Sequence, residues 1–153
     1  MYEIIVGRDQ EDKLMYGERK KRKVKTPLQK LHDRCWAMAK KVIYLRDHKQ
    51  CQHCYKRVEG ANAHTSHILP KSTHGALKYI LLNLKLLCYH CHINWWHKNP
   101  VEAGEWVKET FPERWEIIEK MPRLKSYRVD ILQKILEELQ TEYERINNEC
   151  GIR

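Results

Sequence analysis

Two matched segments, Cys51-Gln-His-Cys54 and Cys88-Tyr-His-Cys91, decide the fold of this chain. Each pair presents two sulfur ligands on a tight turn, and four thiolates satisfy the tetrahedral coordination of zinc. The 33 residues between the pairs exceed the ~15–20 of an ordinary zinc ribbon. We therefore expect a structural zinc ion at the cysteines and an insertion with chemistry of its own. The alternative is a pair of disulfides in an oxidising compartment.

The composition indicates one domain of ordinary size. The 153 residues are 42% hydrophobic and 32% charged, so a bound metal would add usefully to the folding free energy. No run approaches the ~18 apolar residues of a membrane span, and residues 1–6 do not resemble a secretory signal. Only Cys35 and Cys150 remain outside the paired motif, so we expect a reducing cytoplasm and no membrane partner.

Positive charge is concentrated in the first two thirds of the chain. Residues 13–49 hold 13 Lys/Arg against 3 acids, residues 50–100 hold 6 against 1, and residues 101–149 hold 8 against 12. This asymmetry favours a polyanion such as DNA. A solvated basic helix and a nuclear targeting signal are the alternatives. The candidate DNA-binding residues are Arg19, Lys20, Lys21, Arg22, Lys23, Lys40, Lys41, Arg46 and Lys71.

Apolar periodicity predicts several helices. Thr26 and Pro27 are suited to cap and open a helix through Arg46, and Cys35 lies on its apolar stripe as a small buried residue. Pro100 and Pro112 are each suited to open a further helix. We expect three parts, namely an arm at 1–26, a helix with the zinc and nuclease core at 27–100, and a helical extension at 101–153.

A last helix is predicted over residues 126–147. Its apolar residues recur at intervals of three and four, but only for about two and a half heptads, which is short for a coiled coil. The helix could pack on its own domain or form a dimer zipper, so the chain is expected to be a monomer or a homodimer through this helix. The stripe consists of Val129, Leu132, Leu136, Leu139, Tyr143 and Ile146.

The insertion between the cysteine pairs carries polar residues suited to phosphodiester hydrolysis. A strand over 61–68 brings His67 to its end, and an imidazole that titrates near neutral pH can act as general base. His92 follows Cys91 directly and is the candidate ligand of a catalytic Mg²⁺ or Mn²⁺. Asn83 is the candidate organiser, through hydrogen bonds or an oxygen ligand. The plainer alternatives are a structural histidine at the strand end and a turn asparagine.

Other histidines near these positions are weaker candidates. His97 is five residues after His92, about 140° around an α-helix, so we do not expect the two to share a metal. His64 and Ser66 fall on one face of the strand, and either could approach the metal. His53 and His90 are expected to face solvent or phosphate. Trp95 and Trp96 could stack on bases or pack in the core.

These motifs resemble the HNH superfamily of ββα-metal endonucleases. The resemblance lies in Ser66-His67-Ile68-Leu69-Pro70-Lys71-Ser72 and in Asn83-Leu84-Lys85-Leu86-Leu87-Cys88-x-x-Cys91-His92. More narrowly, residues 27–146 are similar to phage recombination endonucleases of the lambda NinG/Rap type, including Ile43-Tyr44-Leu45-Arg46-Asp47 before the first cysteine pair.

The resemblance implies an α+β fold, with a ββα-metal core on a four-cysteine zinc site, flanked by N-terminal and C-terminal helices. It implies His67 as general base, Asn83 as the central Asn and His92 as a ligand of the divalent metal. Many family members have an Asp where this chain has Ser66, which leaves the metal ligands incomplete, with His64 a possible substitute.

The same resemblance implies a DNA endonuclease of a phage or prophage, acting in the bacterial cytoplasm on branched recombination intermediates. A packaging-associated or restriction-type HNH nuclease is the closest alternative. A zinc-dependent module that binds DNA without cleaving it is the other, since Ser66 could mark a decayed site.

Overall fold

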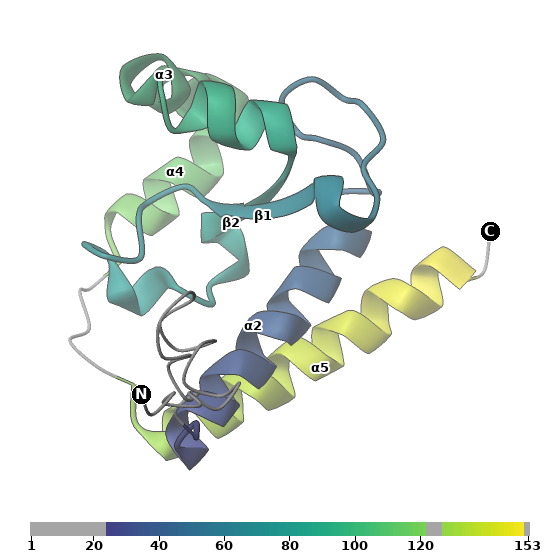
Figure 1. The fold of residues 1–153 in the computed structure, drawn as a ribbon, viewed down its shortest axis with the longest axis vertical. Coiled ribbons are helices and arrows are strands. Elements are labelled where there is room, and N and C mark those ends of the chain that lie inside the picture. Colours follow the sequence, from purple (N-terminus) through teal and green to yellow (C-terminus); the bar gives the residue numbers. More distant parts are fainter. Residues whose placement is uncertain (1–23, 122–126, 152–153) are drawn as a thin grey trace, which may run out of the picture.

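Two short antiparallel strands, β1 (Ala63–His67) and β2 (Leu84–Cys88), lie at the centre of the fold (Figure 1). Ser66 pairs with Lys85 across the ladder, and His67 pairs with Leu84. Side chains alternate between the faces of a strand, so the face that carries Ser66 is opposite the face that carries His67. The two neighbouring side chains, Ser66 and His67, therefore point to opposite sides of the hairpin.

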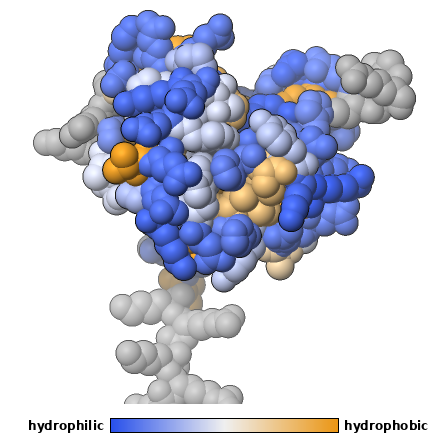
Figure 2. Space-filling model, turned by 90° about the horizontal axis from the view of Figure 1, so that it is seen from above, coloured by the Kyte–Doolittle hydropathy of each residue, from blue (hydrophilic) through white to orange (hydrophobic). Residues whose placement is uncertain are grey.

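The computed structural model describes residues 24–121 and 127–151. The predicted N-terminal arm, including the basic run Arg19, Lys20, Lys21, Arg22 and Lys23, lies outside the described residues apart from its last three positions. Within the described part, no helix combines the length and the apolar character needed to cross a membrane. Hydrophilic side chains cover most of the face seen in Figure 2.

Helix α2 (Pro27–Arg46) confirms the predicted first helix. The Thr26 hydroxyl accepts a hydrogen bond from the backbone N–H of Gln29, and the Gln29 side chain accepts one from the backbone N–H of Thr26. This capping box satisfies donors that would otherwise lack partners at the helix start. Cys35 is fully buried and donates its thiol to the carbonyl of Leu132, which fits the predicted small core residue.

Helix α5 (Val129–Gly151) packs along α2 (Figure 1). From the predicted stripe, Leu132, Leu136 and Leu139 join the main core, and Ile146 is buried as well. The stripe is therefore covered by the chain's own helix. The dimer zipper through α5 is not supported, because four of the six apolar residues that would form its seam, Leu132, Leu136, Leu139 and Ile146, are already buried within one chain.

A second, smaller core lies between the loop after β1 and the helices α3 (Pro100–Thr110) and α4 (Pro112–Glu119). Both helices begin at the prolines that the sequence singles out. Buried Val107 and Ile118 pack with Ile68 and Leu77 of the loop. Two short 3₁₀ turns, η2 (Gly75–Leu77) and η3 (Leu81–Asn83), shape this loop. A third, η1 (Gly60–Asn62), precedes β1.

A short π-helix, η4 (His90–Trp96), follows β2 and completes a strand–strand–helix unit around the cysteines. In a π-helix the backbone N–H bonds to the carbonyl five residues earlier. The N–H of His97 makes such a bond to the carbonyl of His92. The sequence predicts a short helix here, but as an α-helix, and the wider turn changes which side chains meet.

Candidate metal centre and active site

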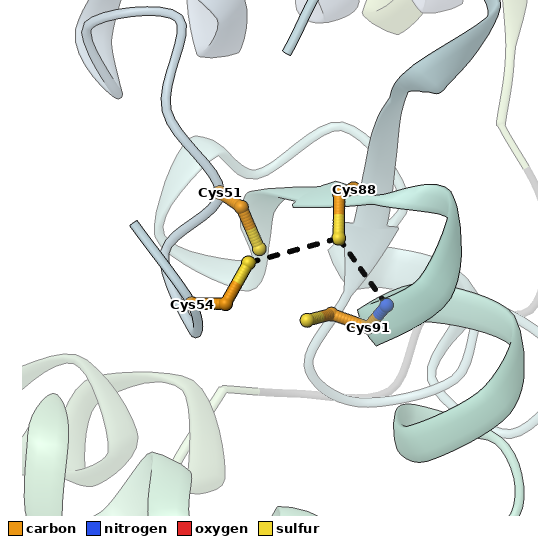
Figure 3. A group of neighbouring side chains, drawn as sticks. All are labelled: Cys51, Cys54, Cys88 and Cys91. Atoms are coloured by element: carbon orange, nitrogen blue, oxygen red, sulfur yellow. Dashed lines mark hydrogen bonds between the residues drawn. The ribbon is translucent and has the colours of Figure 1, made fainter. Parts of the chain in front are cut away.

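The four cysteines of the two knuckles converge on one point (Figure 3). Their sulfur atoms all lie within 4.8 Å of one another, and Cys54 Sγ is 3.8 Å from Cys88 Sγ. Four sulfurs bound at about 2.3 Å to a tetrahedral zinc ion lie about 3.8 Å apart. The cysteines are free thiols, so the disulfide alternative is not what the structure shows. The cluster could hold a metal ion such as zinc.

His53 supports this cluster from the side. Its Nδ1 lies 3.3 Å from Cys91 Sγ, and its ring stacks on Trp95 with the centroids 3.6 Å apart. His53 is half-buried, so its ring faces solvent only in part, because it lies between the Cys91 sulfur and the Trp95 indole. His90 is exposed as expected.

His67 is held in one orientation at the end of β1. Its Nε2 lies 3.1 Å from the carbonyl oxygen of Lys78, and the indole of Trp36 stacks on it at 5.1 Å and 6°. A carbonyl only accepts, so Nε2 carries the proton of the neutral ring and Nδ1 keeps its lone pair. Burial lowers the pKa of His67, which favours the neutral form that a general base requires.

Asn83 is fully buried and braces the loop after β1. Its Oδ1 accepts from the N–H of Leu69 at 2.7 Å, and its Nδ2 donates to the carbonyls of Leu69 and Leu77 at 3.1 Å each. Of the roles considered for this residue, the geometry favours bracing. An oxygen ligand would need to reach a metal from a position with no exposed surface.

Three histidines form a row beside η4. His64 Nδ1 lies 2.9 Å from His92 Nδ1, and His92 Nε2 lies 3.1 Å from His97 Nε2. Burial, followed by the charges of His97 and His64, lowers the pKa of His92 to about 4. His92 is therefore neutral at pH 7, which is the form that binds a metal.

The expectation that His92 and His97 point apart is wrong, and the π-helix explains why. In an α-helix, five residues turn through about 500°, which leaves the two side chains about 140° apart. In a π-helix, where each N–H bonds to the carbonyl five residues earlier, the same step returns to nearly the same face. His97 thus approaches His92 rather than facing away from it. Two nitrogens bound to one cation at about 2.1 Å and at right angles would lie about 3.0 Å apart, close to the observed separation.

The proton arrangement assigns different roles to the two neighbours of His92. His64 Nε2 lies 3.0 Å from the carbonyl of Ala61, so it donates there, and in the neutral ring Nδ1 must accept. His92 Nδ1 then donates to His64 and leaves its Nε2 lone pair facing His97. His64 thus orients His92 from behind, as the partners of metal-binding histidines commonly do.

Ser66 and Lys85 face each other beneath Trp96. Ser66 is buried, with its Oγ 3.4 Å from the carbonyl of His67. Lys85 is fully buried, with its Nζ 3.4 Å from the same carbonyl and 3.1 Å from the centroid of the Trp96 ring. Burial lowers the pKa of Lys85 well below its usual value, with the Arg114 charge acting in the same direction.

Lys85→Met is expected to stabilise the fold by about 1–4 kcal/mol, because methionine fills a similar volume without a buried charge. Between the lowered pKa and about 10.4, the unfolded chain binds a proton that the native state releases. The native protein should therefore gain stability as pH rises through this window. Urea unfolding at several pH values tests this, since the variant should lose that gain. If the unfolding free energy of both proteins depended on pH in the same way, Lys85 would not have the lowered pKa that burial predicts.

A cavity of about 710 Å³ joins these residues. Its polar wall includes Ser66, His67, Lys71, His92 and His97, so it brings together the candidate base and the His92–His97 pair. Among the described residues that line it there is no Asp or Glu. Sequence reasoning missed two residues of this site, Trp36 on the cavity wall and Lys85 beneath Trp96, and it set His97 aside on α-helical geometry.

The candidate DNA-binding residues fall into three groups. Lys40, Lys41 and Lys71 are exposed and free to meet a phosphate. Arg46 is instead structural, because it bonds to Asp47 and to the carbonyls of Leu81 and Leu84. The third group is the basic run of residues 19–23, which lies outside the described part. Trp95 and Trp96 are both half-buried.

Residues 51–94 match the family model of the HNH endonucleases. The matched segment contains the four cysteines, His67, Asn83 and His92. No curated protein and no solved structure matches the chain. The match covers less than half of the chain; it supports the resemblance of this segment to the HNH superfamily and suggests a nuclease or DNA-binding role.

Proposed function

We propose that this protein is a metal-dependent HNH endonuclease that hydrolyses phosphodiester bonds in DNA. The observation that carries the proposal is the orientation of His67. The carbonyl of Lys78 fixes its Nε2 proton, Trp36 fixes its plane, and Nδ1 remains available on the wall of a cavity that also holds His92. A structural histidine has no need for an unused basic nitrogen in a cavity.

In the proposed reaction, His67 Nδ1 takes the proton of the attacking water. The Lys78 carbonyl and the Trp36 ring hold the imidazole while its charge develops. Asn83 keeps the loop that carries Lys78 in register with β1. When bound, a divalent cation would stabilise negative charge on the phosphate and the departing oxygen.

His92 and His97 are the proposed ligands of this cation, and His64 orients His92. Two imidazoles without a carboxylate suit Mn²⁺ better than Mg²⁺, because Mg²⁺ prefers oxygen ligands. We also propose zinc as the metal of the four cysteines, because its preferred distances match the sulfur spacing. In this assignment, β1, β2 and η4 form the ββα-metal unit of the superfamily.

Lys40, Lys41 and Lys71 are proposed to contact DNA phosphates, together with the basic run of residues 19–23. The preference for branched DNA, the origin in a phage or prophage and the cytoplasmic location rest on the resemblance to recombination endonucleases. Packaging-associated and restriction-type nucleases share the same core, so the substrate distinguishes them.

The experiment that tests the function incubates the protein with supercoiled plasmid, linear duplex and a labelled four-way junction in Mg²⁺ or Mn²⁺. We expect cleavage that leaves 5′-phosphate and 3′-hydroxyl ends and that stops on chelation of the divalent cation. Symmetric cuts in the junction would indicate a recombination enzyme. Intact DNA in every condition would contradict the proposal.

A zinc-dependent DNA-binding module is the second candidate, and Ser66 is the observation that favours it. A neutral hydroxyl stands where many family members have a metal-binding Asp, and here it is directed at the carbonyl of His67. This candidate predicts retained DNA binding without cleavage. The His92–His97 pair argues for the enzyme, because a binding module has no use for a second pair of metal ligands.

His97→Ala is expected to raise the Mn²⁺ concentration for half-maximal cleavage by at least roughly 10-fold, because loss of a mere partner of a metal ligand already costs about 10–100-fold. The matched control is His48→Asn. His48 is exposed, does not line the cavity and has a φ of 53°, a conformation that Asn tolerates. A Mn²⁺ titration of plasmid nicking measures both. Equal midpoints for the two variants would remove His97 from the metal site.

A further inference from the structure

The cavity is larger and more apolar than hydrolysis of a phosphate requires. About 710 Å³ lies within the range of ~300–1,000 Å³ typical of sites for whole small molecules. Beyond the histidines, it is lined by Trp36, Trp96, Trp115 and Ala103. A metal ion, a water and a phosphate group need polar partners. Trp36 already stacks on His67 and Trp96 covers Lys85, but these rings and Trp115 also give the cavity an apolar wall that phosphate hydrolysis does not require.

Helix α3 keeps the cavity open by carrying small residues toward it. Ala103 is buried and Gly104 is half-buried, and both line the cavity. A Cβ added to Gly104 would meet no heavy atom within 4 Å. Glycine inside a helix costs about 1 kcal/mol relative to alanine, and here the missing side chain leaves space beside the active site.

We propose that this cavity receives one unpaired nucleobase next to the scissile phosphate. The inference rests on the proposed nuclease function and names the structural class of its substrate, namely DNA with an unstacked nucleotide. The same cavity is lined by His67 and His92, so a strand held at the active site can place a neighbouring base against the tryptophans.

The chemistry of the walls fits a nucleobase better than other occupants. Indole rings stack on any base regardless of its sequence, and a cationic rim at Lys71 complements the phosphate that accompanies the base. A stacked duplex is far too wide for this space, so a paired nucleotide would have to leave the helix first. That cost is least for a base that is already unpaired.

The experiment measures binding without cleavage, in the full chain with its metals and with His67→Ala. Two labelled duplexes are compared by fluorescence anisotropy, one with a single bulged thymine and one with an abasic site at the same bulge. We expect the bulged thymine to bind roughly 5- to 150-fold more tightly, the range of one base–aromatic stack. Absence of this preference would overturn the inference, and the measurement needs no further variant.

Gly104→Met, in the same background, fills the cavity and is expected to abolish the preference for the base. Val101→Met places the same side chain at an exposed position of α3 that does not line the cavity, so it should retain the preference. Circular dichroism checks that both proteins fold. A preference that survives in Gly104→Met would overturn the inference.

The proposed function and this inference fail in different ways. Plasmid cleavage by the unmodified protein decides whether it is a nuclease. Base preference in the His67→Ala protein decides whether the cavity holds a nucleobase, with or without cleavage.

Discussion

Cys88→Ala is expected to remove the metal from the cysteine cluster and to unfold the part of the domain that the strands and η4 form. Cys88 ends β2, and its sulfur accepts a hydrogen bond from the N–H of Cys91 at 3.3 Å, so one residue anchors both a strand and a helix. Structural zinc contributes about 10–16 kcal/mol at neutral pH. That is as large as the whole stability of a typical domain, about 5–15 kcal/mol.

Metal content and thermal unfolding measure this effect. We expect one zinc ion per chain in the parent protein, little or none in Cys88→Ala, and loss of its cooperative unfolding transition. Cys35→Ala is the matched control, because Cys35 is a buried thiol of α2 outside the cluster. It should keep its zinc. Equal metal content and equal unfolding temperatures for the parent and Cys88→Ala would show that the cluster is not a metal site.

Asn83→Ala is expected to destabilise the protein by about 2–4 kcal/mol and to reduce cleavage by about 100-fold. The substitution removes three hydrogen bonds of about 1 kcal/mol each and leaves the groups of Leu69 and Leu77 unpaired in the interior. The loop they belong to also carries Lys78, whose carbonyl orients His67. A displacement of about 1 Å at a catalytic group can cost 100-fold in rate.

Urea unfolding and plasmid nicking at saturating cation test both parts of this prediction. Asn94→Ala is the control, since Asn94 is an exposed residue of η4 whose side chain hydrogen-bonds with His90 and with Lys98 just beyond the helix. It should change neither quantity by much. Full activity in Asn83→Ala, despite the lost stability, would show that the loop does not position His67.

Much of the fold could be predicted from local patterns. The start of α2 follows from Thr26 and Pro27, and the starts of α3 and α4 follow from their prolines, because these residues act within one turn of the helix. The spacing of the cysteines predicted their convergence, since the chemistry of one metal requires it. The sequence did not specify the partner of α5, because an apolar stripe does not state which surface covers it.

The missed parts of the site depend on geometry that sequence spacing does not encode. His97 was excluded on α-helical geometry, but the π-helix turns it toward His92. Trp36 lies beside the apolar stripe of α2 and meets His67 only through tertiary packing. Lysine is usually a surface residue, but every residue of β2 is buried, so the Lys85 side chain is buried as well.

The central claim is that His67 is the general base of a DNA endonuclease. The most direct measurement is the rate of plasmid nicking by the parent, His67→Ala and His48→Asn. All three proteins are loaded with Zn²⁺ and assayed at saturating Mn²⁺. Because the pKa of His67 is lowered, the parent should keep its full rate at pH 7 and somewhat below 6.5. We predict a loss of roughly 10²–10⁴-fold in His67→Ala and none in His48→Asn. Equal rates for the parent and His67→Ala would contradict the account.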